Sequence, residues 1–227
     1  MRYKFLLLLA VTLLFTNPLN ASSSKDIEHL SPMTRAAELA LLDSVLSPFE
    51  DMTEYALACN GKGVLNSLQE IQKRDQEVTF KDSFSAVDYI VFKEKLNQLT
   101  TEIKLKHYNN VALLSTAIFH YNVIHFKYAK LIKEQIIIEN LDYMGYQTLA
   151  LLKQKKIDYK ELYTVQFKTM ELWESLKPKV KDKNLVDSFD LLFHGLKTSS
   201  MKQDVDSIKI FASLDLTLVD ILEKPFQ

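Results

Sequence analysis

Cysteine, glycine and proline are all scarce in this chain of 227 residues. Cys59 is the only cysteine, so no internal disulfide can form and stability must come from the core, from a ligand or from self-association. Four glycines and five prolines are too few to separate the many short strands of a β-rich protein. These shortages exclude a disulfide scaffold and favour long helices, with Cys59 as a small residue near a helix end.

An excess of positive charge is missing as well. The chain carries 28 Lys and Arg against 29 Asp and Glu, which gives a net charge of −1. A general nucleic-acid-binding protein needs a concentrated positive face to neutralise phosphate groups. We therefore predict that the protein does not bind nucleic acid.

The N-terminus has the three-part layout of a Sec-type signal peptide. Arg2 and Lys4 precede an apolar run over residues 5–15, and a small residue, Ala21, follows it. This run is too short to cross a hydrocarbon core of about 30 Å, which needs about 20 apolar residues. We predict that residues 1–21 are removed near Ala21 and that the protein is periplasmic or secreted.

Two properties of the chain after Ala21 bear on its compartment. It contains eight Asn but no Asn-X-Ser/Thr glycosylation acceptor, which favours a bacterial periplasm over eukaryotic secretion. Removal of Arg2 and Lys4 leaves 26 Lys and Arg against 29 Asp and Glu, so the mature chain has a net charge of −3.

Helical periodicity dominates after a polar segment, residues 22–31, that we expect to be flexible. Apolar residues recur at three- and four-residue spacing, with capping residues before each run and stop signals behind it. The predicted helices are one from about 32 to 59 with a kink or break at Ser47–Pro48, a shorter one over 64–71, one from 83 to about 103, a long one from 109 or 110 to about 133 or further, and three over about 158–176, 184–196 and 204–222.

Short connections between these helices favour antiparallel neighbours. We therefore predict an all-α, up-and-down bundle of about six or seven helices over residues 32–227. Residues 140–146 leave an alternative open, because Gly145 costs a helix about 1 kcal/mol relative to Ala. Residues 32–227 are therefore either one bundle or two subdomains that are joined near Gly145.

Several motifs that mark catalysis or a cofactor are absent. None of the five histidines follows a Glu at the Glu-x-x-His spacing of di-iron bundles, and His-Glu-x-x-His is missing. A single cysteine excludes the Cys-x-x-Cys-His attachment of covalent haem, and Gly-x-Ser-x-Gly does not occur. We predict a non-enzymatic protein without a cofactor.

One constellation could form a binding site. Tyr121, His125 and Tyr128 lie at i, i+4 and i+7 of the long predicted helix and would point three polar-tipped rings toward the interior. As a ligand-binding wall, the site would use His125 as ligand or proton carrier. The alternative is a core histidine bonded to a tyrosine. His120 lies about 140° away around the helix and is expected to face solvent or the next helix.

The last two predicted helices, residues 185–223, resemble the closing hairpin of the haem-carrying four-helix cytochromes in their pattern of leucine and aromatic residues around Phe189, Leu192 and Phe193. That family places an axial histidine near the C-terminus, and no histidine follows His194 here. Haem binding is therefore not carried over from the resemblance.

Lysines gather at two predicted helix junctions. Lysine near a helix C-terminus complements the helix dipole, which accounts for the first cluster, whereas the second is either a solvated loop or a peripheral contact with an anionic membrane surface. The clusters are Lys153, Lys155, Lys156 and Lys160, and Lys177, Lys179, Lys181 and Lys183.

These features together predict a protein of the cell envelope that acts by binding a partner protein or a small ligand. The alternative is a metal- or haem-associated bundle that uses the pocket of Tyr121, His125 and Tyr128.

Overall fold

The computed structural model describes residues 34–224 and residue 226. The predicted signal peptide and the polar segment after it, residues 1–31, lie outside these described residues. Within them, 84% of the chain is helical and no strand occurs, which confirms the all-α prediction. Among the described helices, none is long and apolar enough to cross a membrane.

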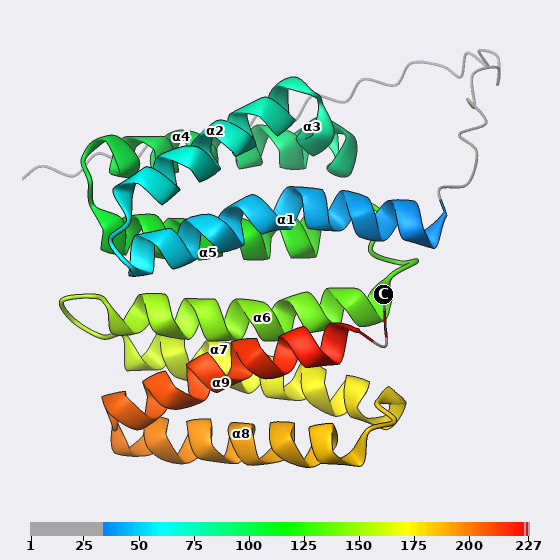
Figure 1. Cartoon of the computed structure of the whole chain (residues 1–227), viewed down its shortest axis with the longest axis vertical. Helices are drawn as coiled ribbons and strands as arrows, with labels where there is room; N and C mark the ends of the chain where they lie inside the picture. The colour runs from blue at the N-terminus through cyan, green and yellow to red at the C-terminus, as the bar shows by residue number, and fades with distance from the viewer. Residues whose placement is uncertain (1–33, 225, 227) are drawn as a thin grey trace, which may run out of the picture. The chain divides into compact units, whose positions relative to one another are not determined.

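The described chain forms nine α-helices and one 3₁₀-helix (Figure 1). The prediction of about six or seven helices was too low because α3 is too short to show a period, and because the expected helix from residue 109 past 133 is two helices. The helices are α1 (Arg35–Leu57), α2 (Gly61–Gln76), α3 (Thr79–Ser83), α4 (Ala86–Lys104), α5 (Tyr108–His125), α6 (Lys133–Leu152), α7 (Tyr159–Leu176), the 3₁₀-helix η1 (Lys177–Lys179), α8 (Lys183–Lys202) and α9 (Val205–Glu223).

Two clusters of buried apolar side chains hold the helices together. In the first, which α1 to α5 supply for the most part, the Phe80 and Phe92 rings stack with centroids 4.5 Å apart. In the second, which lies among α6 to α9, the Trp173 and Phe189 rings also stack at 4.5 Å. Aromatic pairs of this kind add about 0.5–1.5 kcal/mol each beyond the area that they bury.

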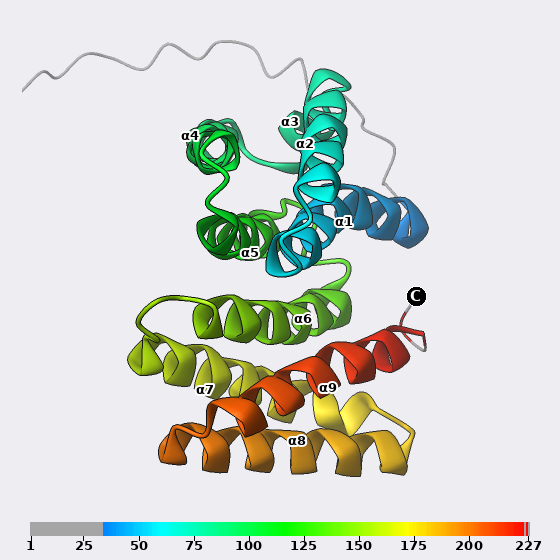
Figure 2. The same ribbon diagram turned by 60° about the vertical axis from the view of Figure 1, so that its left-hand side comes forward.

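Helix α6 is common to both clusters. It packs against α1 and α5 on one side and against α7 and α9 on the other (Figures 1 and 2). Gly145 permits the contact with α9, because a Cβ there would lie 2.8 Å from Leu216 Cγ and 2.9 Å from Asp215 Oδ2. The helix runs unbroken through Gly145, where the sequence leaves a subdomain boundary open.

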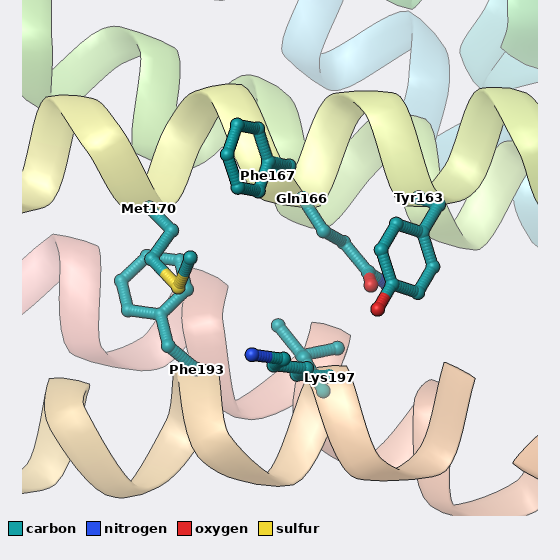
Figure 3. A pocket seen from close by; sticks show the side chains of 7 residues that line it. Tyr163, Gln166, Phe167, Met170, Phe193 and Lys197 are labelled. Atoms are coloured by element: carbon teal, nitrogen blue, oxygen red, sulfur yellow. The ribbon is translucent and has the colours of Figure 1, made fainter. Parts of the chain in front are cut away.

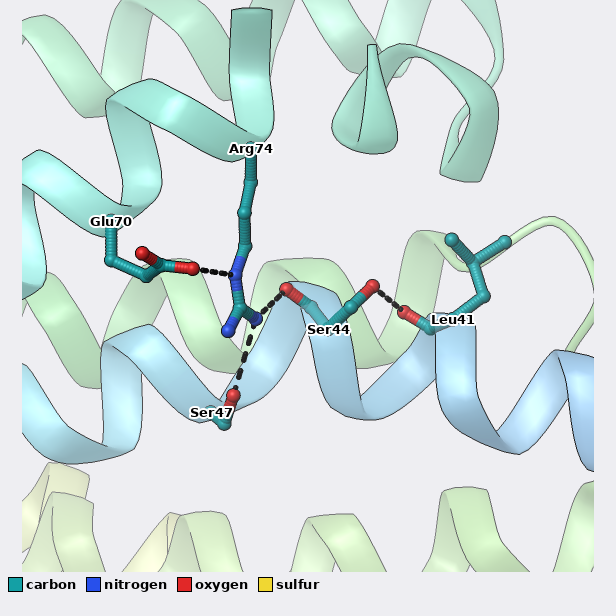
Figure 4. A network of polar contacts seen from close by, with 5 residues as sticks. All are labelled: Leu41, Ser44, Ser47, Glu70 and Arg74. Carbon is teal, nitrogen blue, oxygen red and sulfur yellow. Dashed lines mark hydrogen bonds and ion pairs between the residues drawn. The ribbon is translucent and has the colours of Figure 1, made fainter. Parts of the chain in front are cut away.

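Helix α1 also continues without a break through Pro48, where the sequence predicts a kink or break. Proline has no N–H, so the carbonyl of Ser44 loses its partner within the helix. Arg74 of α2 replaces that partner, because its guanidinium donates to the Ser44 carbonyl and to Ser47 Oγ at 3.2 Å (Figure 4). Glu70 accepts from Arg74 Nε at 2.9 Å and holds the guanidinium in place.

Helix ends use non-glycine residues in the left-handed conformation, which suits a chain with few glycines. After α1, Cys59 has φ 53°, its amide donates to the Ala56 carbonyl at 3.0 Å, and the next amide, of Asn60, donates to Tyr55 at 2.7 Å. This pair of bonds is a Schellman motif. Cys59 is therefore an exposed residue just beyond the end of α1.

Candidate functional site

A groove of 930 Å³ lies between α5, α6 and α7. Its inner wall combines His120 of α5 with Asn140 and Tyr143 of α6. Its outer wall is a face of α7 that carries alternating charges and hydroxyls. The outer-wall residues include Asp158, Lys160, Glu161, Thr164, Lys168, Glu171 and Ser175.

His120 is fixed in this groove by stacking. Its ring lies 4.1 Å from the Tyr143 ring, with only 13° between the two planes. Burial lowers the pKa of His120 below its ordinary value, and the ammonium of Lys168 lowers it further, whereas a hydrogen bond with Asn140 opposes both. The imidazole is therefore neutral at pH 7.

Asn140 is held beside His120, because its amide nitrogen donates to the Ile136 carbonyl at 2.6 Å. Nδ1 of His120 is buried and has no hydrogen-bond partner among the described residues. A buried polar atom without a partner is costly to the folded state.

The three residues singled out from the sequence do not form one wall. Helix α5 ends at His125, so Tyr128 does not share its face with Tyr121 and His125. Tyr128 instead packs edge-on against Phe126, and Lys127 lies over its ring. The premise of a helix reaching residue 133 was wrong, because Phe126 adopts an extended conformation that ends α5.

Tyr121 and His125 do lie together, at the contact between α5 and α4. Their rings stack at 4.2 Å, and both contact Asp88 of α4. His125 Nδ1 is 2.8 Å from Asp88 Oδ1, and the Tyr121 hydroxyl donates to the same oxygen at 3.3 Å. A hydrogen bond from Ser85 and the nearby His125 lower the pKa of Asp88. Because Tyr121 and His125 both contact this carboxylate, Asp88 links α4 to α5.

A smaller apolar depression lies between α7 and α8 (Figure 3). Its volume is 130 Å³, and its walls are mainly aromatic and aliphatic side chains, among them Phe167, Met170 and Phe193. It offers few polar groups to fix a ligand. The groove at His120 is both larger and chemically richer.

Carboxylates collect in a third hollow, of 430 Å³, between α1, α6 and the end of α9. Asp43 and Glu50 come from α1, Glu139 from α6 and Glu223 from α9. Burial raises the pKa of Glu139 to about 8, and burial with repulsion from the neighbouring acids raises the pKa of Glu50 well above its usual range. The sequence shows Glu50 only as part of an acidic stretch on α1.

The second lysine cluster meets specific contacts in the structure. Within the second lysine cluster, Lys177 pairs with Asp190 at 2.6 Å and Lys179 with Glu134 at 2.5 Å, so these two charges are partly neutralised. Across the described residues, no group of three or more His, Cys, Asp or Glu side chains is arranged to hold a metal ion.

Comparison with known proteins gives no family for the chain. Neither a protein-family model, nor a curated protein, nor a solved structure matches it. The candidate site therefore rests on its own geometry.

Sequence reasoning missed the main residues of the groove. Asn140 and Tyr143 lie in the interval that it left ambiguous, and Lys168 is one of many lysines in the chain. His120 could have been found, because its angle around α5 places it toward the next helix, which is α6.

Proposed function

We propose that this is an exported, non-enzymatic protein of up-and-down helical topology that binds a small polar ligand in the groove between α5, α6 and α7. The observation that carries this proposal is the His120 ring, which lines the groove and is stacked on the Tyr143 ring. A ligand with hydrogen-bonding groups would contact the His120 imidazole and the Asn140 amide there. Pockets that combine an apolar floor with a few fixed polar groups are the usual form of small-molecule sites.

The residues that line the groove further restrict the chemistry of the ligand. Lys168 stands close enough to His120 to lower its pKa, so an anionic group of the ligand would find a cation beside the imidazole. Thr164 and Glu161 on the same wall add hydroxyl and carboxylate partners. These groups together suit a small molecule that carries both hydrogen-bond donors and a negative charge.

A thermal-shift screen of small hydroxy acids and amino acids tests this function. We expect His120→Ala to weaken binding of any hit by about three- to tenfold, which corresponds to one neutral hydrogen bond. His194→Ala is the matched control because His194 is exposed on α8, away from the groove. A hit that binds both variants equally, or a screen without hits, would contradict the proposal.

Export is tested on the full-length chain expressed in a bacterial host. The layout of residues 1–21 supports cleavage near Ala21, so the mature protein should begin near Ser22 and reside in the periplasmic fraction. Intact mass of the recovered protein identifies its N-terminus. A protein that keeps Arg2 and Lys4 and stays in the cytoplasm would show that these residues are not a signal peptide.

A further inference from the structure

The acid-lined hollow between α1, α6 and α9 lies away from the groove at His120 and carries a different chemistry. Asp43, Glu50, Glu139 and Glu223 line it, and no lysine or arginine does so among the described residues. Asp43, Glu139 and Glu223 each raise the pKa of another member of the set, so the carboxylates are close in space. The cavity therefore favours a cation.

Gln135 provides a second and independent indication of a ligand. Its side chain lines the cavity and is only 5% exposed. Its amide nitrogen donates to Glu139 at 2.8 Å, but its carbonyl oxygen is buried and has no hydrogen-bond donor among the described residues. A buried acceptor of this kind is satisfied by a ligand that carries N–H groups.

The cavity also has a length and a polarity pattern. Asp43 and Glu50 are seven residues apart on α1, which places them on nearly the same face and about 10 Å apart along the axis. Leu46 lies between them on α1 and lines the cavity, whereas Leu39 and Leu42 of the same wall precede Asp43. Two acidic positions separated by an apolar side chain match a chain of methylene groups between two ammonium groups.

We propose that this cavity binds a linear diamine or polyamine, with one ammonium group near Asp43 and another between Glu50, Glu139 and the Gln135 carbonyl. A cation there would favour the ionised carboxylates, so binding at pH 7.5 would release protons from the buried acids. A compact metal ion fits less well, because the acidic side chains of the described region do not converge as metal ligands.

Titration calorimetry of the full chain with putrescine and spermidine tests the proposal. We expect binding with one site per chain, proton release that is visible as a dependence of the heat on the buffer, and an increase in Tm. The double variant Glu50→Gln, Glu139→Gln should lower the affinity by at least about tenfold. Because these changes remove buried charge without changing shape, the variant should fold, and its Tm and circular dichroism verify this.

Three controls separate the alternatives. Glu94→Gln removes one exposed charge on α4 and should leave binding unchanged, as should His120→Ala in the groove. 1,4-Butanediol, which has the length of putrescine without its charge, should not bind. Equal affinity of the double variant and the wild-type chain, absence of binding, or displacement of putrescine by an equal concentration of Mg²⁺ would each overturn the proposal.

Discussion

Val78 is the residue whose backbone conformation is least suited to its side chain. It lies between α2 and α3 with φ 58°, in the left-handed region that costs an L-residue roughly 1–2 kcal/mol. A β-branched side chain is especially unfavourable there. Because the Val78 side chain is 46% exposed, its apolar burial offsets little of this backbone cost.

We therefore expect Val78→Gly to increase the free energy of unfolding by about 1 kcal/mol. Urea unfolding monitored by circular dichroism measures the change. Ile90→Gly is the control, since Ile90 is an exposed residue within the regular part of α4 and should lose about 1 kcal/mol. A loss of stability in Val78→Gly would mean that its packing outweighs the backbone strain.

At the scale of an element, α1 depends on a side chain from another helix. The contact of Arg74 with the Ser44 carbonyl supplies the donor that Pro48 cannot. Arg74→Met keeps the apolar stem of the side chain but removes this donor. We expect it to destabilise the protein by about 1.5–3 kcal/mol, the range for a hydrogen bond from a charged group.

The Pro48→Ala background makes this prediction specific. With an amide at position 48, the Ser44 carbonyl regains a donor within α1, so Arg74→Met should cost clearly less there. Chemical unfolding of the two single variants and the double variant gives the coupling energy. Lys73→Met, at an exposed neighbouring position on α2, should have little effect. Additive effects of the two changes would refute the compensation.

Helices α1 and α5 show why some features can be predicted from the sequence and others cannot. Period and capping residues are local, so the all-α class and most helix starts follow from the sequence. The partner that satisfies the carbonyl freed by Pro48 lies 30 residues away, so proline alone predicts a break. The end of α5 is likewise fixed from a distance, where the amide of Lys127 donates to the Ser83 carbonyl at 3.0 Å.

The candidate site depends even more on such distant contacts. His120 and Tyr143 are 23 positions apart in the printed sequence, and only the packing of α5 on α6 stacks their rings. Tyr121 and His125 are one helical turn apart, so their stacking was within reach of sequence reasoning. Their carboxylate partner, Asp88, belongs to another helix and was not.

On the scale of the whole molecule, buried acids at the junction of α1, α6 and α9 should make stability depend on pH. Burial raises the pKa of Glu139 to about 8 and raises that of Asp215 well above its ordinary value. Repulsion from neighbouring acids adds to the effect of burial at Glu50, Glu139 and Asp142. The acids that supply it are Asp43, Glu50, Asp51, Glu139, Asp215 and Glu223. The folded state therefore binds protons more tightly than the unfolded state.

The sign of the effect follows from linkage. Stability is complete below the unfolded pKa of about 4.5 and is lost as pH rises through the folded pKa of about 8. We expect Tm to fall between pH 5 and pH 8.5, and Glu139→Gln to flatten this dependence and raise Tm at pH 8.5. His120 acts in the opposite direction below about pH 6.5, because its folded pKa is lowered.

Calorimetric scans across this range, without added amines, provide the measurement. His120→Ala separates the histidine contribution from that of the acids. A Tm that rises steadily from pH 5 to pH 8.5 in wild type would show that the acids are ionised at little cost in the folded chain.

The position of α6 also determines how the protein unfolds. Ile138 and Met144 of this helix belong to the second apolar cluster, whereas Ala150 belongs to the first. Unfolding of either cluster would remove the packing on one side of α6 and would weaken the packing of α6 against the other cluster. We therefore expect the two cores to unfold as a single cooperative unit, in which neither the α1–α5 part nor the α7–α9 part persists as an independent folding intermediate.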